Sequence, residues 1–101
     1  MLKKQYLADN KTCKVTFTSD PVVTKNAAKA SVVGEFNGWD ENADPMKRRK
    51  DGTFAAAIKL GCGKHYQFRY LIDGSIWEND AKADRYVRTP FGDCDNSVIE
   101  V

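Results

Sequence analysis

No stretch of this sequence is apolar for long enough to cross a membrane, because none approaches the ~18 residues that a spanning helix needs. The basic residues Lys3 and Lys4 are not followed by the apolar segment of a signal peptide. Charge of one sign is not in excess either, since 16 Lys and Arg residues stand against 14 Asp and Glu residues, a net charge of +2. Nucleic-acid-binding proteins typically carry a one-signed basic surface. We therefore expect a cytoplasmic protein that binds neither membranes nor nucleic acids.

Cysteine and histidine are scarce. The cysteines, Cys13, Cys62 and Cys94, are an odd number without the paired spacing of a disulfide framework or a zinc cluster. We expect free, reduced thiols, as in most cytosolic proteins. The single histidine, His65, lies next to a predicted turn, and no triad or metal cluster can be built around it. Neither a cofactor nor a metal is therefore expected.

The sequence also lacks a recognisable pair of catalytic carboxylates. Glu78, Asp80 and Asp84 are the candidates for glycoside hydrolysis, which uses two carboxylates at a defined separation. Their spacing carries no specific signature, and acidic residues in loops are usually solvated. We predict that the protein has no catalytic residues and is not an enzyme.

What the sequence does contain is a series of short segments with alternating polarity. A chain of 101 residues, 42% hydrophobic and 30% charged, suits one soluble domain. No segment keeps a helical period, and turn-forming residues separate the segments, which predicts an all-β fold, an immunoglobulin-like β-sandwich. Residues 1–12 are expected to form a lead-in that pairs at a sheet edge, and residues 13–101 the single domain. The predicted strands are 13–18, 30–36, 46–50, 53–60, 65–72, 76–78 and 97–101, with a long polar loop before the last one.

The segment 65–72 is the clearest of these strands. One face carries large apolar or aromatic side chains and should point to the core, whereas the other face is more polar. The core-facing set is Tyr66, Phe68, Tyr70 and Ile72, and the opposite set is His65, Gln67, Arg69 and Leu71.

Two tryptophans stand among polar residues. Trp39 follows an apolar run that breaks at Gly34-Glu35-Phe36-Asn37-Gly38, where a loop offers no obvious core for the indole, and Trp77 has the same character. A flat apolar ring beside polar groups suits a ligand with one apolar face and many hydroxyls, such as a sugar. We predict that the two indoles form one sugar-binding surface. The polar partners expected for the hydroxyls are Arg69, Asn96, and Gln67 or Asn79.

Four segments of the chain, in order, resemble a known family. They are Phe36-Asn37-Gly38-Trp39, the run from Tyr66 to Gly74, Trp77-Glu78-Asn79-Asp80 and Asn96-Ser97-Val98-Ile99. They are similar to the glycogen-binding domain of the AMP-activated protein kinase β subunit. More widely, they resemble the family 48 carbohydrate-binding modules, which are also the isoamylase-type N-terminal (early set) domains of glucan branching and debranching enzymes. The resemblance covers about residues 13–101 and extends to short bacterial proteins made of this domain alone.

This resemblance implies a non-catalytic domain that binds α-1,4-linked glucan of the glycogen or starch type. In the family, two tryptophans stack on glucose rings, and Trp39 and Trp77 match them. Arg69 stands where a lysine usually contacts sugar hydroxyls, and Asn96 matches an asparagine with the same role. Phe91 falls near a leucine that lies against the sugar in kinase-type domains, although the loop lengths differ there. Family members act attached to kinases or glucan-metabolising enzymes, so either is a candidate partner in trans.

The turn before Trp77 is where the chain departs from the kinase-type motif. Two residues, rather than one, separate Asp73-Gly74 from Trp77. A two-residue loop would place Trp77 opposite Tyr70, on the core side, whereas a three-residue loop places it opposite Leu71, on the outer face. We predict the three-residue loop, because such hairpins with a left-handed glycine are common and because this register also buries Ile76.

A function of a different class is the alternative. The chain would then be a protein-interaction or regulatory immunoglobulin-like module that acts on a kinase or on a glucan-metabolising enzyme. Retention on amylose or glycogen separates this hypothesis from glucan binding.

Overall fold

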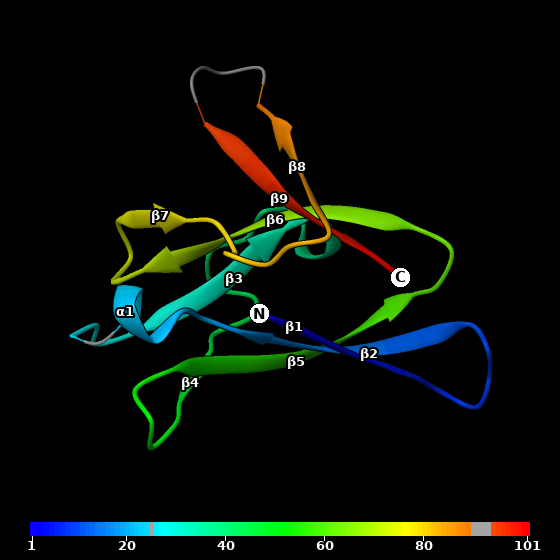
Figure 1. Cartoon of the computed structure of the whole chain (residues 1–101), viewed down its shortest axis with the longest axis horizontal. Coiled ribbons are helices and arrows are strands. Elements are labelled where there is room, and N and C mark those ends of the chain that lie inside the picture. Colours follow the sequence, from blue (N-terminus) through cyan, green and yellow to red (C-terminus); the bar gives the residue numbers. More distant parts are fainter. Residues whose placement is uncertain (25, 90–93) are drawn as a thin grey trace.

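Two antiparallel sheets face each other in the computed structural model of the chain, which describes residues 1–24, 26–89 and 94–101 (Figure 1). One sheet has the strand order β1-β2-β5-β4, and the other has β3-β6-β9-β8 with β7 also paired to β6. The protein is thus the all-β, immunoglobulin-like sandwich that the sequence predicts. The strands are β1 (Leu2–Tyr6), β2 (Thr12–Thr18), β3 (Ala30–Gly34), β4 (Lys47–Arg48), β5 (Phe54–Gly61), β6 (His65–Ile72), β7 (Ile76–Glu78), β8 (Arg85–Arg88) and β9 (Asp95–Glu100).

In the part of the chain that the structure describes, helical structure consists of two short elements, α1 (Pro21–Thr24) and the 3₁₀ turn η1 (Glu35–Asn37). Within the three described ranges, no helix has the length and hydropathy of a membrane span.

The core between the sheets follows the alternation of the strands. On β2, Cys13, Val15 and Phe17 are fully buried, and on β6, Phe68 and Tyr70 point inward as predicted. The ring centroids of Phe17 and Phe68 are 5.1 Å apart, and those of Phe68 and Tyr70 are 5.7 Å apart, both edge to face. Such aromatic pairs contribute about 0.5–1.5 kcal/mol beyond the burial of their area. The outer face of β6 is therefore free to carry polar side chains.

The structure differs from the sequence prediction in several segments, and the predicted strand 46–50, for example, is reduced to β4. The predicted strand 30–36 ends at Gly34, because η1 begins at the next residue. The predicted polar loop before the last strand contains β8, which pairs with β9. This strand is four residues long and has an arginine at each end, so its pattern is too short and too polar to stand out.

Asp80 is a fully buried carboxylate that links distant parts of the chain. Its Oδ2 accepts hydrogen bonds from the Tyr70 hydroxyl at 2.5 Å and from the α-ammonium of Met1 at 2.6 Å, and its Oδ1 accepts one from the Lys82 amide at 2.7 Å. These bonds satisfy a charge that would otherwise be costly to bury. Burial, and next the Asp80 carboxylate, raise the pKa of Tyr70 well above its ordinary value.

Alkaline pH is predicted to destabilise the protein through Tyr70. Because the folded state raises the pKa of this phenol, the folded protein keeps a proton that the unfolded chain releases above a pH of about 10. The free energy of unfolding should therefore fall as pH rises beyond that value. Urea unfolding across this range should show a smaller fall in Tyr70→Phe than in the unmodified protein. The control Tyr6→Phe, on an exposed ring, should match the unmodified protein, and an equal fall in Tyr70→Phe would contradict the prediction.

Strands β3 and β6 approach each other closely at Gly34, which pairs with Phe68. A Cβ at Gly34 would lie 2.5 Å from the carbonyl oxygen of Gln67 and 2.7 Å from the Cβ of Phe68. A Cβ at Gly61, in contrast, would meet the Tyr66 hydroxyl at an ordinary 3.6 Å. Only glycine fits at Gly34 without a backbone shift.

Replacement of Gly34 by alanine is predicted to lower the free energy of unfolding by about 1–3 kcal/mol, because the strands must separate to admit the methyl group. Gly61→Ala is the matched control and should be neutral or slightly stabilising. Urea denaturation of both variants measures the difference. Equal effects of the two substitutions would show that the close approach is unimportant.

Candidate functional site

The loop that follows β3 is held by the side chain of Asn37. Its Oδ1 accepts a hydrogen bond from the Gly34 amide at 3.1 Å, and its Nδ2 donates to the carbonyl of Val32 at 3.1 Å and to Asp44 Oδ2 at 2.8 Å. The Trp39 amide donates to the carbonyl of Gly34 at 2.9 Å. The asparagine of the Phe36-Asn37-Gly38-Trp39 motif thus fixes the backbone that carries the indole.

Trp39 is held with its indole outward and its backbone strained. Its φ is 60°, directly after Gly38 with φ 66°, and the left-handed region costs a residue with a Cβ about 1–2 kcal/mol. Phe36, three residues earlier, instead points inward, with its ring 5.4 Å from that of Phe17. Trp39 remains 38% exposed, so it is not folded back onto the sandwich. Strain of this kind gathers at functional positions.

The turn before Trp77 has the predicted three-residue loop. Leu71 pairs with Trp77 and Ile72 pairs with Ile76, which leaves residues 73–75 as the connection. Trp77 therefore lies on the outer face and is 39% exposed. The expected burial of Ile76 is wrong, since this side chain is 51% exposed. It belongs to a three-residue edge strand, so the face that is covered at Ile72 is left open at Ile76.

Arg69 lies on the outer face of β6, next to Trp77. Its guanidinium carbon is 5.2 Å from the centre of the Trp77 ring, a cation–π contact. The Nε atom of Arg69 is buried and has no hydrogen-bond partner among the described residues. Among the described residues, the partner that orients this side chain is therefore the Trp77 indole.

Asn96 is the second residue of β9, and its side chain contacts that of Gln67 on β6. Its Nδ2 donates to Gln67 Oε1 at 3.0 Å. Its Oδ1 is buried and, within the described part of the chain, unpaired. Because Nδ2 donates to Gln67, the orientation of the Asn96 amide is fixed, and Oδ1 remains available as a hydrogen-bond acceptor.

These side chains meet in a cleft of about 400 Å³, which is within the usual size range of small-molecule sites. Trp77 does not line the cleft, but it contacts Arg69, which does. The Glu35 carboxylate accepts a hydrogen bond from the backbone amide of Gln67 at 2.6 Å, beyond the point where β3 ends. The cleft is lined by Glu35, Trp39, Gln67, Arg69, Thr89, Cys94 and Asn96.

One predicted contact, Phe91, lies outside the described residues, and another, Asn79, is not among the residues that line the cleft. Asn79 uses its amide within the fold, where Nδ2 donates to the carbonyl of Asp95 at 2.8 Å and Oδ1 accepts from the Ser97 hydroxyl at 2.8 Å. Asn79 therefore secures the segment after Trp77.

Three residues of the cleft were not predicted from the sequence. Glu35 directly precedes the motif that carries Trp39, so its position in the sequence could have predicted that it lies near the site. Thr89 and Cys94 belong to a segment without periodicity, and no pattern in the sequence places them beside Arg69.

The chemistry available in the cleft is hydrogen bonding and stacking. Among the described residues that line it, the only carboxylate is that of Glu35, which accepts a hydrogen bond from a backbone amide. Among the residues considered for catalysis, Asp80 is buried against Tyr70, and Asp84 bonds to Lys4 at 2.7 Å. Burial alone would raise the pKa of Asp84, but hydrogen bonds from the Glu100 amide and from Lys4 hold it below its usual value. In the ranges that the structure describes, no three His, Cys, Asp or Glu side chains are grouped to hold a metal.

Comparison with known proteins finds a family whose model matches this chain. The model of carbohydrate-binding module 48 (isoamylase N-terminal domain) matches residues 13–87. The 1,4-alpha-glucan branching enzyme GlgB of Butyrivibrio fibrisolvens is 43% identical over 61 residues, which are 60% of this chain and 10% of that enzyme. The enzyme of the same name from Oceanobacillus iheyensis is 36% identical over 69 residues, 64% of this chain and 11% of that enzyme.

The chain thus spans about a tenth of the length of these relatives. The family match covers most of the chain, including both tryptophans, Arg69 and the turn between Arg69 and Trp77. The chain therefore belongs to the family 48 carbohydrate-binding modules.

Proposed function

We propose that this module binds α-1,4-linked glucan without catalysis, by stacking glucose rings on Trp39 and Trp77. Arg69 and Asn96 bind the hydroxyls at the edge of the sugar. The observation that carries the proposal is a pair of buried polar atoms, Arg69 Nε and Asn96 Oδ1, that have no partner in the described chain and line one cleft with an exposed indole.

The chemistry of a pyranose matches this arrangement. Its faces are C–H groups that pack on aromatic rings, and its rim consists of hydroxyls, each of which both donates and accepts hydrogen bonds. Adjacent hydroxyls can therefore accept from Arg69 Nε and donate to Asn96 Oδ1. A buried polar atom without a partner costs about 1–3 kcal/mol. A ligand that pairs both atoms recovers part of that free energy.

The choice of an α-1,4-glucan is supported by the relatives. Their printed name, 1,4-alpha-glucan branching enzyme, specifies the polymer on which they act. The described residues that line the cleft include no acid–base pair, so the role proposed for this chain is attachment to the polymer. The proposal includes a cytoplasmic location and a glucan-metabolising enzyme as the partner in trans.

Loss of either indole is predicted to weaken binding. The unmodified protein should bind maltoheptaose with a Kd between about 1 μM and 1 mM. Trp39→Ala and Trp77→Ala should each raise the Kd by about 5- to 150-fold, if stacking on a sugar is worth as much as stacking on a nucleic-acid base. Isothermal titration calorimetry measures the change.

Tyr6→Ala is the matched control for these variants, because Tyr6 is an exposed aromatic residue on β1 of the opposite sheet. Circular dichroism of all three variants tests that the fold is retained. If the unmodified protein does not bind millimolar maltoheptaose, glucan binding is wrong. A protein that co-purifies in that case would favour the interaction-module hypothesis.

Bound glucan is also predicted to protect Cys94 from alkylation. Cys94 is exposed and lines the cleft, whereas Cys13 is buried. Burial, and next the charges of Cys13 and Asp9, raise the pKa of Cys62, which should react slowly. Maltoheptaose should therefore slow the reaction of Cys94 with iodoacetamide and leave that of Cys62 unchanged, as measured by mass spectrometry of the labelled peptides.

The matched ligand for this experiment is cellohexaose, which has the same glucose units in β-1,4 linkage and should give no protection. Equal protection of Cys94 and Cys62 would indicate a general change in the protein rather than occupancy of the cleft. Unchanged labelling of Cys94 in the presence of bound maltoheptaose would place the ligand elsewhere.

A further inference from the structure

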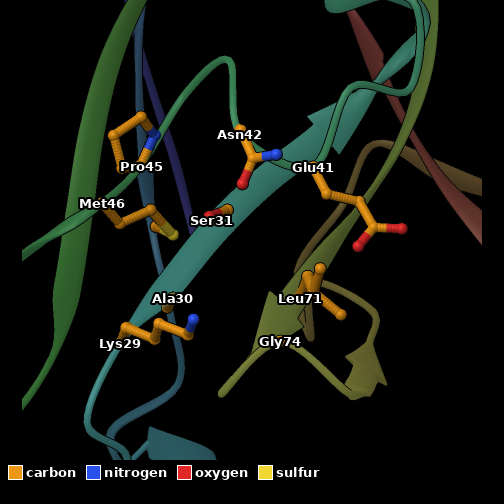
Figure 2. A pocket seen from close by; sticks show the side chains of 9 residues that line it. All are labelled: Lys29, Ala30, Ser31, Glu41, Asn42, Pro45, Met46, Leu71 and Gly74. Atoms are coloured by element: carbon orange, nitrogen blue, oxygen red, sulfur yellow. The ribbon is translucent and has the colours of Figure 1, made fainter.

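A second cleft, of about 360 Å³, opens on the same sheet (Figure 2). It lies between the loop after Trp39, the start of β3 and the turn that joins β6 to β7. Figure 2 shows Glu41 and Asn42 descending from the loop and Lys29 reaching across from the opposite side, with Ser31 and Leu71 on the two strands between them.

Backbone hydrogen bonds hold the loop wall of this cleft beside β3. Pro45 forms a bridge with Ser31. The Met46 amide donates to the carbonyl of Ala30 at 2.8 Å, and the Val32 amide donates to the carbonyl of Asp44 at 3.1 Å. This wall is therefore part of the sheet rather than a free loop.

The opposite wall is held by Asp73. Its Oδ1 accepts hydrogen bonds from the amides of Ala28 at 2.7 Å and Lys29 at 3.1 Å. The Asp73 amide in turn donates to the carbonyl of Lys29 at 3.0 Å. These bonds tie the segment before β3 to the turn before Trp77, so the cleft is formed before any ligand arrives.

The lining combines an apolar floor with polar groups that the chain does not use. Leu71 and Met46 are buried at the floor. Across the described residues, none of the four polar side chains at the rim makes a hydrogen bond of its own. These four are Lys29, Ser31, Glu41 and Asn42.

The charges at the rim favour a neutral occupant. An anionic ligand would meet the Glu41 carboxylate, and a cationic ligand would meet the Lys29 ammonium. A neutral polyhydroxyl compound can instead donate to Glu41 and accept from Lys29. Its apolar faces can at the same time rest on Leu71, as expected for a sugar.

The second cleft continues the first along β6. Arg69 lines the first cleft and Leu71 the second, and these residues lie on one face, two positions apart, about 7 Å along the strand. Trp77, which contacts Arg69 and pairs with Leu71, stands at the boundary. A single extended ligand can therefore reach both clefts.

We propose that the second cleft binds further glucose units of the same glucan chain that occupies the first, so that the module selects long chains over short ones. This inference rests on the proposed function of the first cleft. The affinity for a long chain is higher because one ligand joins two weak sites, which makes the second binding step intramolecular.

The test compares maltotriose, which is expected to occupy the first cleft alone, with maltoheptaose. The double variant Lys29→Ala/Asn42→Ala removes two hydrogen-bonding groups from the second cleft. It should weaken maltoheptaose binding by about 5- to 150-fold, as expected for two net hydrogen bonds, and leave maltotriose binding unchanged. Ser31→Ile, which fills the cleft with a strand-forming residue, should act in the same way. Lys14→Ala, on an exposed lysine of the opposite sheet, is the control.

Amide NMR spectra give a second readout that a change in folding would not mimic. Maltoheptaose should shift the resonances of Ser31 and Asn42 in the unmodified protein, and maltotriose should shift only those around Arg69 and Asn96. The inference is overturned if maltoheptaose leaves Ser31 unshifted, or if the variants weaken both sugars equally. If neither sugar binds the unmodified protein, the proposed function itself fails, which is a distinct result.

Discussion

The turn at residues 73–75 is the constraint on which the face carrying the proposed site depends. Successive residues of a strand point to opposite faces, so one residue more or less in this turn would move Trp77 from the outer face to the core. The left-handed backbone of Asp73 and Gly74 closes the turn. The same aspartate binds the segment before β3 through its side chain. One short turn thus sets the direction of an indole and forms a wall of the second cleft.

Around that turn, the fold assigns opposite roles to adjacent residues. The inward residues of β6 build an aromatic core with β2, whereas the outward residues, Gln67, Arg69 and Leu71, run beneath both clefts. The rigid core allows the outer face to keep features that a free surface would relax. These are the left-handed backbone conformation of Trp39 and two buried polar atoms without partners in the described chain. Both features raise the free energy of the unliganded protein, and ligand binding can offset the second.

Much of the fold could be predicted because strand alternation and turn chemistry are local properties. The strand 65–72, its inward face and the register that sets Trp77 opposite Leu71 all follow from spacing along the chain. β8 could not be predicted, because four residues with charged ends gain their structure by pairing with β9. The exposure of Ile76 was also missed, since burial depends on what the other sheet covers and not on the side chain's own character.

By itself, the sequence determined the class of the fold, the family and the two exposed indoles. Ordered motifs and the alternation of polar and apolar residues along a strand are properties of residues that are close in the sequence. Only the tertiary structure decided which polar groups stand beside those indoles. It engaged Asn79 within the fold, left Asn96 Oδ1 and Arg69 Nε without partners among the described residues, and brought Glu35 and Cys94 into the cleft. Hydrogen-bond partners come from strands far apart in the chain, so their availability is settled only when the sheets have packed.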